Sequence, residues 1–193
     1  VQRGELAEFQ LPTSQSAVLN RVTGADPSLI AGTLRSNGQV FLINPNGVLV
    51  GPGGQVLTNG FTASTLDVRN EDFLRGGPLR FQGAATGTVT NQGSIVARDG
   101  DVVLIAQQVD HSGRIEATAG TAALLAAATV TLARDGQDRL LVQLGAVPAA
   151  GTVSTTGVIA ASAVELRAAG GNPLALAVRA GGAIRALTLT GDG

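Results

Sequence analysis

The side chains that could perform acid–base or metal chemistry are few in this sequence, and they are not gathered in one segment. His111 is the single histidine and there is no cysteine, so thiolate catalysis and cysteine-ligated metal sites are excluded. Asp99-Gly100-Asp101 and Gly51-Pro52-Gly53-Gly54 lack the spacing of an EF-hand and of a phosphate-binding loop, and turns explain both stretches. We expect no catalytic residue, no metal ligand and no cofactor.

The composition indicates a core of small aliphatic side chains. The chain has 193 residues, of which 44% are hydrophobic but only 3% aromatic. Such side chains suit a thin, regularly layered core better than a bulky globular one. The formal net charge is −1 and the arginines are scattered singly, so no nucleic acid partner is expected. The longest apolar stretch, residues 122–128, is far shorter than the ~20 residues of a membrane-spanning helix, so we expect no transmembrane segment.

A repeat in the middle of the chain predicts how this core is layered. Residues 93–106 match residues 113–126 without a gap, so that Ile95 aligns with Ile115 at a spacing of 20. Short apolar runs between Gly and Asn at such a period are typical of a solenoid, in which stacked turns form a continuous core. The same Gly-x-apolar-x-small pattern begins at Gly47, Gly93, Gly113 and Gly157.

Two segments also fit helical structure. Residues 118–134 are rich in alanine, the best helix former, although Gly120 and the match to the preceding repeat favour a strand. Residues 24–32 predict one helical turn, because Asp26 can cap it and Pro27 suits its first position.

The domain organisation follows from where the repeat is regular. We expect residues 1–35 to form an N-terminal capping region and residues 36–193 to form the rungs of one solenoid. Clustered charge and turn residues predict excursions from the stack near residues 69–83 and 134–148. The whole chain is interpreted as one fragment of a larger protein.

The tetrapeptide Asn44-Pro45-Asn46-Gly47 separates two apolar runs, residues 40–43 and 48–50. Asn-Gly is a strong hairpin signal, and Pro45 fixes φ while Asn46 and Gly47 tolerate positive φ. The repeat that follows favours a corner between successive solenoid strands over a hairpin.

Residues 36–51, which contain this tetrapeptide, and residues 58–67 closely resemble the secretion domain of bacterial two-partner secretion exoproteins. This is the filamentous haemagglutinin or haemagglutination-activity family, and these residues are most similar to its high-molecular-weight adhesin branch. The likeness is dense from Ser16 to Val68 and looser beyond. Many relatives carry a second motif, Asn-Pro-Asn-Leu, upstream of the first. The corresponding region of this chain, residues 10–15, lacks that motif.

The resemblance implies an all-β fold, a right-handed parallel β-helix with an N-terminal cap and extra-helical β-hairpins. It implies a TpsA-type exoprotein that loses a signal peptide, crosses the periplasm and reaches the cell surface or the medium. Its implied partner is a TpsB-type outer-membrane β-barrel transporter with POTRA domains, and the domain is expected to be a monomer.

The resemblance also marks specific residues. The motif for transporter recognition or folding is Asn44, Pro45, Asn46 and Gly47, and the supporting family motif is Asn20, Arg21, Asn59 and Gly60. A motif asparagine could contact the transporter or only build the corner. We favour the structural role for Asn46, because turn amides commonly satisfy backbone groups.

The composition suits a chain that stays unfolded until it has been exported. Without cysteine it cannot form disulfides in the periplasm, and few aromatic side chains weaken premature collapse. A solenoid grows by adding rungs to an existing edge. We therefore hypothesise that the first rungs seed folding outside the cell.

The main rival class is a β-helix enzyme that degrades polysaccharides, which needs carboxylates gathered on one face. The repeat register gives no such stack, since it places Asp101 beside Thr121 and Asp110 beside Val130. It places His111 beside Asn91 at a rung corner, where a polar structural residue is expected. We therefore expect no enzyme activity.

Adhesion is the other rival. The domain could bind host cells or matrix, although in such exoproteins adhesive activity usually lies in later repeats. No aromatic or basic patch is evident in the sequence, and host ligands are expected only through the rest of the exoprotein.

Overall fold

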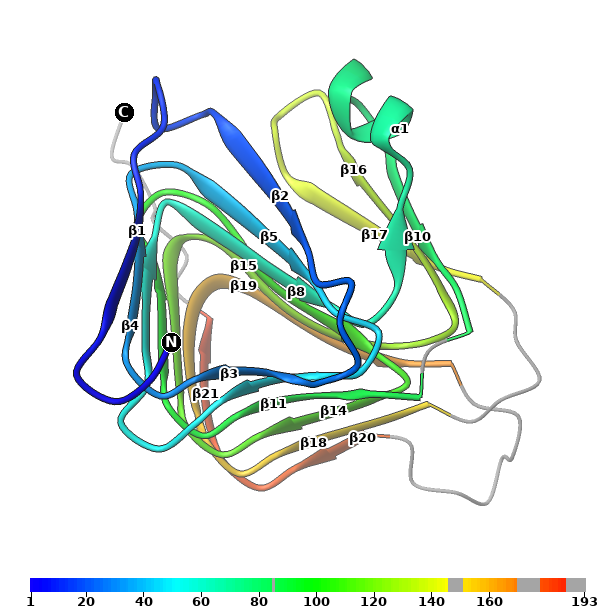
Figure 1. Cartoon of the computed structure of the whole chain (residues 1–193). Coiled ribbons are helices and arrows are strands. Elements are labelled where there is room, and N and C mark those ends of the chain that lie inside the picture. Colours follow the sequence, from blue (N-terminus) through cyan, green and yellow to red (C-terminus); the bar gives the residue numbers. More distant parts are fainter. Residues whose placement is uncertain (85, 146–150, 170–177, 187–193) are drawn as a thin grey trace, which may run out of the picture.

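The computed structural model describes residues 1–84, 86–145, 151–169 and 178–186, and it forms a parallel β-helix (Figure 1). The chain winds through three faces in turn, so that each turn, or rung, adds one strand to each face. Most strands pair in parallel with the strands of neighbouring rungs. The predicted all-β class and β-helix architecture are confirmed.

The three faces are made of strands that recur once per rung. The first face contains β1 (Leu6–Phe9), β4 (Thr33–Ser36), β7 (Gln55–Thr58), β12 (Ser94–Ala97), β21 (Ala183–Ala186) and the first parts of β15 (Arg114–Ala126) and β19 (Val158–Ala168). The second face contains β2 (Ala17–Arg21), β5 (Gln39–Ile43), β8 (Gly60–Ser64), β13 (Val102–Ala106) and the second parts of β15 and β19. The third face contains β3 (Ser28–Ile30), β6 (Val48–Val50), β11 (Thr88–Asn91), β14 (Gln108–His111), β18 (Thr152–Thr155) and β20 (Val178–Ala180).

The interior of the helix is a stack of matching aliphatic side chains. Val56 pairs with Ile95, Ile95 with Ile115, and Ile115 with Ile159, and all four are fully buried. Each such residue contributes about 1.5–3 kcal/mol relative to an exposed position. Parallel pairing at this register is what the repeat of residues 93–106 predicted.

A second core lies outside the helix, on the second face. The strands β9 (Asp67–Val68), β10 (Leu79–Gln82), β16 (Thr129–Arg134) and β17 (Leu140–Leu144) form an antiparallel sheet. With α1 (Asn70–Arg75), this sheet lies beside the second face in Figure 1. Phe81, Val130 and Leu132 of the sheet pack against outward side chains of the second face such as Val103 and Ile105.

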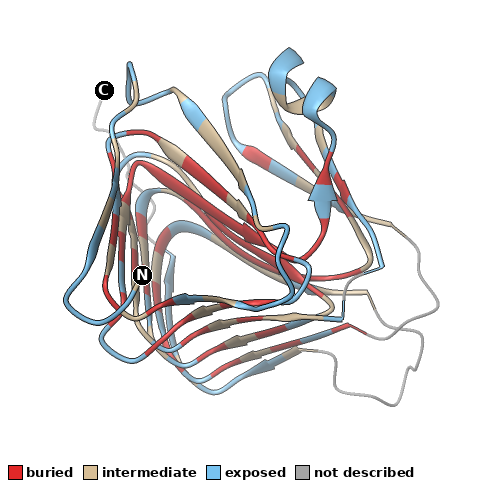
Figure 2. Ribbon diagram, in the orientation of Figure 1, coloured by how far each residue is buried: buried red, intermediate tan, exposed pale blue. Residues whose placement is uncertain are grey.

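The middle strands of the second face are consequently buried on both sides. Every residue of β8 and of β13 is buried, whereas strands of the other faces alternate buried and more exposed positions (Figure 2). The antiparallel β16–β17 hairpin confirms the expected extra-helical hairpins. Residues 146–148 of the expected second excursion, and residues 187–193 of the expected rungs, lie outside the described residues.

The predicted helical turn at residues 24–32 was wrong, whereas the strand favoured for residues 118–134 was correct. Residues 28–30 form β3 and not a helical turn, because parallel pairing with β6 places Ile30 beside Val50 in the core. The strand favoured over a helix for residues 118–134 is confirmed, since residues 114–126 form one strand and residues 129–134 another.

Asp110 lies beside Ser154 and not beside Val130, because the chain leaves the helix between β15 and β18. β1 to β3, which fall within the expected capping region, already pair in parallel with β4 to β6. The division of the chain at residue 35 stays a prediction.

A column of glycines marks the corner before the first face. A Cβ atom on Gly93, Gly113 or Gly157 would lie within 2.1–2.4 Å of the carbonyl oxygen of the preceding glycine of the column, which begins at Gly54. The rungs approach too closely here for any side chain. Gly47 precedes the third face instead, so grouping it with these glycines was wrong, and its place in the column belongs to Gly54.

Gly113→Ala is expected to lower the free energy of unfolding by about 1–3 kcal/mol, because the new methyl group overlaps the backbone of the rung below. Gly136→Ala is the matched control, since a Cβ there meets nothing within 4 Å, and its effect should stay within about 0.5 kcal/mol. Urea unfolding followed by circular dichroism measures both. Equal losses would contradict the proposed close approach.

Candidate functional site

The tetrapeptide 44–47 is a corner that carries the chain from β5 on the second face to β6 on the third. The Asn44 backbone N–H donates to the Ser64 carbonyl at 2.9 Å, and the Gly47 N–H donates to the Asn44 carbonyl at 3.0 Å. Gly47 has a φ of 120°, which favours glycine. The chain turns and continues in the helix without doubling back, as the repeat predicted.

The side chain of Asn44 holds this corner to the rung below. Asn44 is fully buried, and its Nδ2 donates to the Asp26 carbonyl at 3.0 Å and to Ser28 Oγ at 2.9 Å. Its Oδ1 accepts the Asn46 backbone N–H at 3.0 Å. The buried amide is thus satisfied by groups of the rung below and of the corner itself.

Asn46 and Pro45 form the outer tip of the corner, and both are exposed. Asn46 Nδ2 donates to the Gly24 carbonyl at 2.8 Å and to Asn44 Oδ1 at 3.2 Å. The Pro45 carbonyl accepts the Gly87 N–H at 3.2 Å from the rung above. Both amide hydrogens of Asn46 are therefore used inside the domain, whereas its Oδ1 accepts no hydrogen bond from the described residues.

Two more asparagines hold the other loop of the first rung. Asn59 is 4% exposed, and its Nδ2 donates to the Ser14 carbonyl at 3.0 Å. Asn37 accepts the Leu11 N–H and donates to the Leu11 carbonyl, each at 2.7 Å. Sequence reasoning had not singled out Asn37, although the signal was present, because Asn37-Gly38 repeats the Asn-Gly dipeptide of the corner.

We call Asn37, Asn44, Asn46 and Asn59 the asparagine clamp. All four side chains reach the main chain of the first rung at its two loops, residues 11–14 and 24–26. The supporting residue Gly60 has no such side chain, and it pairs with Gln39 at the start of β8. The structure thus brings Asn59 together with the corner in one role while leaving Gly60 in the strand.

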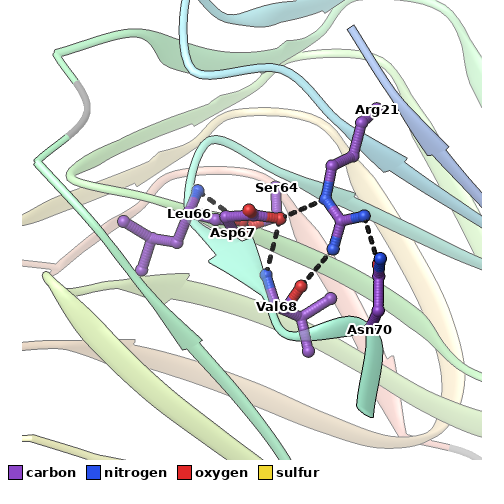
Figure 3. Close-up of polar contacts among 6 residues, drawn as sticks. All are labelled: Arg21, Ser64, Leu66, Asp67, Val68 and Asn70. Atoms are coloured by element: carbon purple, nitrogen blue, oxygen red, sulfur yellow. Dashed lines mark hydrogen bonds and ion pairs between the residues drawn. The ribbon is translucent and has the colours of Figure 1, made fainter. Parts of the chain in front are cut away.

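Arg21 ties the first rung to the extra-helical sheet (Figure 3). From the end of β2, its guanidinium donates to Asp67 Oδ1 at 2.6 Å, to Asn70 Oδ1 at 2.5 Å and to the Val68 carbonyl. Neighbouring Asn20 is partly buried, and its Nδ2 has no hydrogen-bond partner among the described residues. Of the two, only Arg21 therefore has an assignable structural role.

The corner also borders a shallow hollow on the third face. This hollow of about 350 Å³ is lined by Pro27, Asn46, Gly47, Leu49, Thr88 and Thr90, among others. Its lining offers amides, hydroxyls and aliphatic carbons but no titratable side chain. Such a surface can recognise a partner by shape and hydrogen bonding, and it has no group for acid–base chemistry.

His111 lies beside Asn91, as the register predicted. Asn91 Nδ2 donates to His111 Nδ1 at 3.1 Å, and this leaves Nε2–H to donate to the Val158 carbonyl at 3.3 Å. Burial lowers the pKa of His111, and the backbone contacts oppose this only in part. A neutral imidazole that bridges three rungs is structural.

Asp101 is likewise occupied by structural contacts. Its Oδ1 accepts the Thr121 N–H at 2.7 Å, and its Oδ2 pairs with Arg134 at 2.6 Å. Among the described residues, no group of three His, Cys, Asp or Glu side chains is placed to hold a metal ion. None of the helices in this part of the chain has the length and apolarity to cross a membrane.

Comparison with known proteins gives three consistent results. A family model described as the TPS secretion domain matches residues 1–183. A heme/hemopexin-binding protein of Haemophilus influenzae is 35% identical over 176 residues, covering 86% of this chain and 19% of that protein. The crystal structure of the HMW1 secretion domain from Haemophilus influenzae is similar with a TM-score of 0.72 and 35% identity, covering 86% of this chain and 47% of that one. This chain thus spans less than half of either relative.

Asn44→Ala should lower the free energy of unfolding by about 1–3 kcal/mol, because it leaves buried partners of the amide without hydrogen bonds. Gln92→Ala is the matched control, since Gln92 is an exposed amide on the next rung up, and its effect should be within about 0.5 kcal/mol. Urea midpoints at constant m-value measure the difference. A variant Asn44→Ala as stable as the control would show that the corner does not depend on this side chain.

The domain should lose stability as pH falls from about 7.5 to 5.5, because the unfolded chain protonates its histidine near pH 6.5 while burial lowers the pKa of His111 in the folded state. Stability from the neutral imidazole is complete above about pH 6.5 and is lost as pH falls toward the lower folded-state pKa. In His111→Asn this component should vanish, since the chain has no other histidine. Denaturant unfolding at several pH values tests it, and an unchanged pH dependence in the variant would refute it.

Proposed function

The chain belongs to the TPS secretion domain family, and on that premise we propose that it is the secretion signal of a large exoprotein, read by a cognate outer-membrane transporter. Its match to the family model over residues 1–183 and its likeness to the HMW1 secretion domain confirm the expected family and branch. The family is one of secretion domains and not of catalysts. In this proposal the POTRA domains of a TpsB-type transporter bind the chain in the periplasm, and the domain ends outside the outer membrane.

The observation that carries this proposal is that the corner has one buried structural side chain and two exposed residues. Asn44 is fully buried and braces two rungs, while Pro45 and Asn46 are exposed at its tip. The exposed tip adjoins the hollow on the third face. We propose that Asn44 and Gly47 build the corner, and that the transporter binds the Pro45 ring and the Asn46 Oδ1, which accepts no hydrogen bond from the described residues.

The same residues support the second half of the proposal, that the first rungs seed folding of the exoprotein. Ile30 is the only buried apolar side chain in residues 1–31, all of which the structure describes. The first rung therefore contributes little hydrophobic stabilisation of its own, and the asparagine clamp and Arg21 hold it against the second and third rungs. Once held, it offers a finished edge on which further rungs stack.

Pro45→Ala tests binding to the transporter separately from the stability of the corner. It removes part of the exposed tip while leaving the Asn44 bonds in place, so the free energy of unfolding should change by less than about 0.5 kcal/mol. If the tip is an anchor, binding to the purified POTRA domains should weaken about fivefold or more, which is the effect of losing about 1 kcal/mol at an interface, and secretion through the cognate transporter should fall.

The matched control is Pro52→Ala, which truncates an exposed proline at another turn. Circular dichroism and urea unfolding of each purified variant confirm that its fold is intact. Secretion and POTRA binding of Pro45→Ala equal to those of Pro52→Ala would contradict recognition at the tip.

A further inference from the structure

The asparagine clamp contains a chemical feature that its structural role does not require. Three of its four residues are followed by glycine, in Asn37-Gly38, Asn46-Gly47 and Asn59-Gly60. Without a Cβ atom, a glycine that follows asparagine leaves its own backbone nitrogen free to approach the asparagine side-chain carbon. The fourth, Asn44, precedes Pro45, whose nitrogen carries no hydrogen and cannot take part in this reaction.

We propose that these three Asn-Gly bonds are a hydrolytic modification site that is open in the unfolded chain and closed in the folded domain. The glycine nitrogen loses its proton and bonds to Cγ of the asparagine, the Cγ–Nδ2 bond breaks, and Nδ2 leaves as ammonia. Water then opens the resulting cyclic imide at either carbonyl and yields aspartate or isoaspartate. Water is the only co-reactant, and no electron transfer is involved.

Folding closes the sites by holding the reacting groups, both of them at Asn37 and Asn46 and the side-chain amide at Asn59. At the corner, the Gly47 N–H donates to the Asn44 carbonyl at 3.0 Å, and Asn46 Nδ2 is held by the Gly24 carbonyl at 2.8 Å. The first of these bonds keeps the attacking nitrogen in the turn, and the second fixes the side-chain amide that would have to leave.

The other two sites are held in comparable ways. The Gly38 N–H donates to Ser36 Oγ at 3.1 Å, and both polar atoms of the Asn37 amide are bonded to Leu11. Asn59 is 4% exposed, and Nδ2 is fixed on the Ser14 carbonyl at 3.0 Å. In the unfolded chain none of these restraints exists.

The product cannot rebuild the clamp. In each asparagine the Nδ2 donor faces a carbonyl oxygen, of Leu11, Ser14 or Gly24. A carboxylate would place an oxygen atom against that carbonyl oxygen, and neither atom can donate a hydrogen bond. At Asn59 the carboxylate would also be buried, and burying an unpaired charge is costly. Modification therefore removes the bonds that hold the first rung, and a modified chain should fail to complete its fold.

The chemistry itself does not depend on the proposed function, but its consequence in the cell rests on it. A chain held unfolded for secretion would carry open Asn-Gly sites for as long as it waits. Chains that wait too long would lose the capacity to fold after export. The fraction of modified Asn-Gly sites would therefore increase with the time that the domain has spent unfolded.

The test compares the folded chain with the chain held unfolded in guanidinium chloride, both at mildly alkaline pH, followed by peptide mapping with mass spectrometry. Asn37, Asn46 and Asn59 should convert in the unfolded chain and at least about tenfold more slowly in the folded one, since reaction then requires opening of the structure. Asn70 and Asn91, which precede Glu71 and Gln92, are internal controls and should convert in neither sample. Equal rates at Asn46 in the two samples would overturn the proposal.

A refolding step tests the consequence. After ageing in denaturant, the chain is diluted into buffer, and the folded fraction is expected to be depleted of modified clamp residues relative to the aggregated fraction. Asn46→Asp should shift the urea midpoint downward, whereas Gln92→Glu, which adds the same charge at an exposed position, should not. Equal modification in both fractions, or equal midpoints, would overturn the second part. No transporter is present, so failure here and failure of the secretion proposal are distinguishable.

Discussion

The structure depends on holding a first rung whose strands are paired on one side only. β1, β2 and β3 each have a parallel neighbour in the second rung, but the described chain has no strand beyond them to complete their other edge. Such a rung gains half the ladder hydrogen bonds of an interior rung and buries little apolar surface. Side-chain amides replace the missing stabilisation, because one asparagine can satisfy a backbone donor and a backbone acceptor together.

A second constraint is that the second face must be apolar on both sides. Its inward side chains belong to the core of the helix and its outward ones to the core beneath the antiparallel sheet. Leu104 and Leu124 point into the first core, whereas Val103 and Leu125 point into the second. Arg21 then joins the edge of this face to the sheet through Asp67 and Asn70. The helix and its excursions are therefore one cooperative unit and not a solenoid with loose loops.

The sequence predicted the parts of this fold that repeat without interruption. The register of Ile95 with Ile115, and of Asn91 with His111, could be read because no residues are inserted between these rungs. It failed for Asp110, where the chain leaves the helix before the next rung, and insertions of this kind leave no periodic signal. The local signals for a helical turn at Asp26 were genuine, but pairing with β6 outweighed them, as tertiary pairing often outweighs local preference.

The candidate site was predictable as a motif but not as a set of contacts. Resemblance to the family marked Asn44, Asn46, Asn59 and Arg21, yet their partners outside the corner lie 16 to 49 residues away in the chain. No pattern within the motif shows that Asn59 reaches Ser14 or that Arg21 reaches Asp67. Asn37 was missed for the same reason, since its partner Leu11 lies in a loop without a motif.

These separations have a consequence for the order of folding. The contact from Asn59 to Ser14 closes a span of 45 residues, and that from Arg21 to Asp67 closes a span of 46. Closing such spans lowers the conformational entropy of the chain before the contacts can form and offset that loss. The first rung therefore cannot make all of its holding contacts until the chain through residue 67 is available, which is the third rung. On the proposed function, a chain that emerges residue by residue from a transporter would complete the hold on its first rung only after that length has passed. The polar clamp would thereby set a minimum exported length, which an apolar first rung able to collapse alone would not impose.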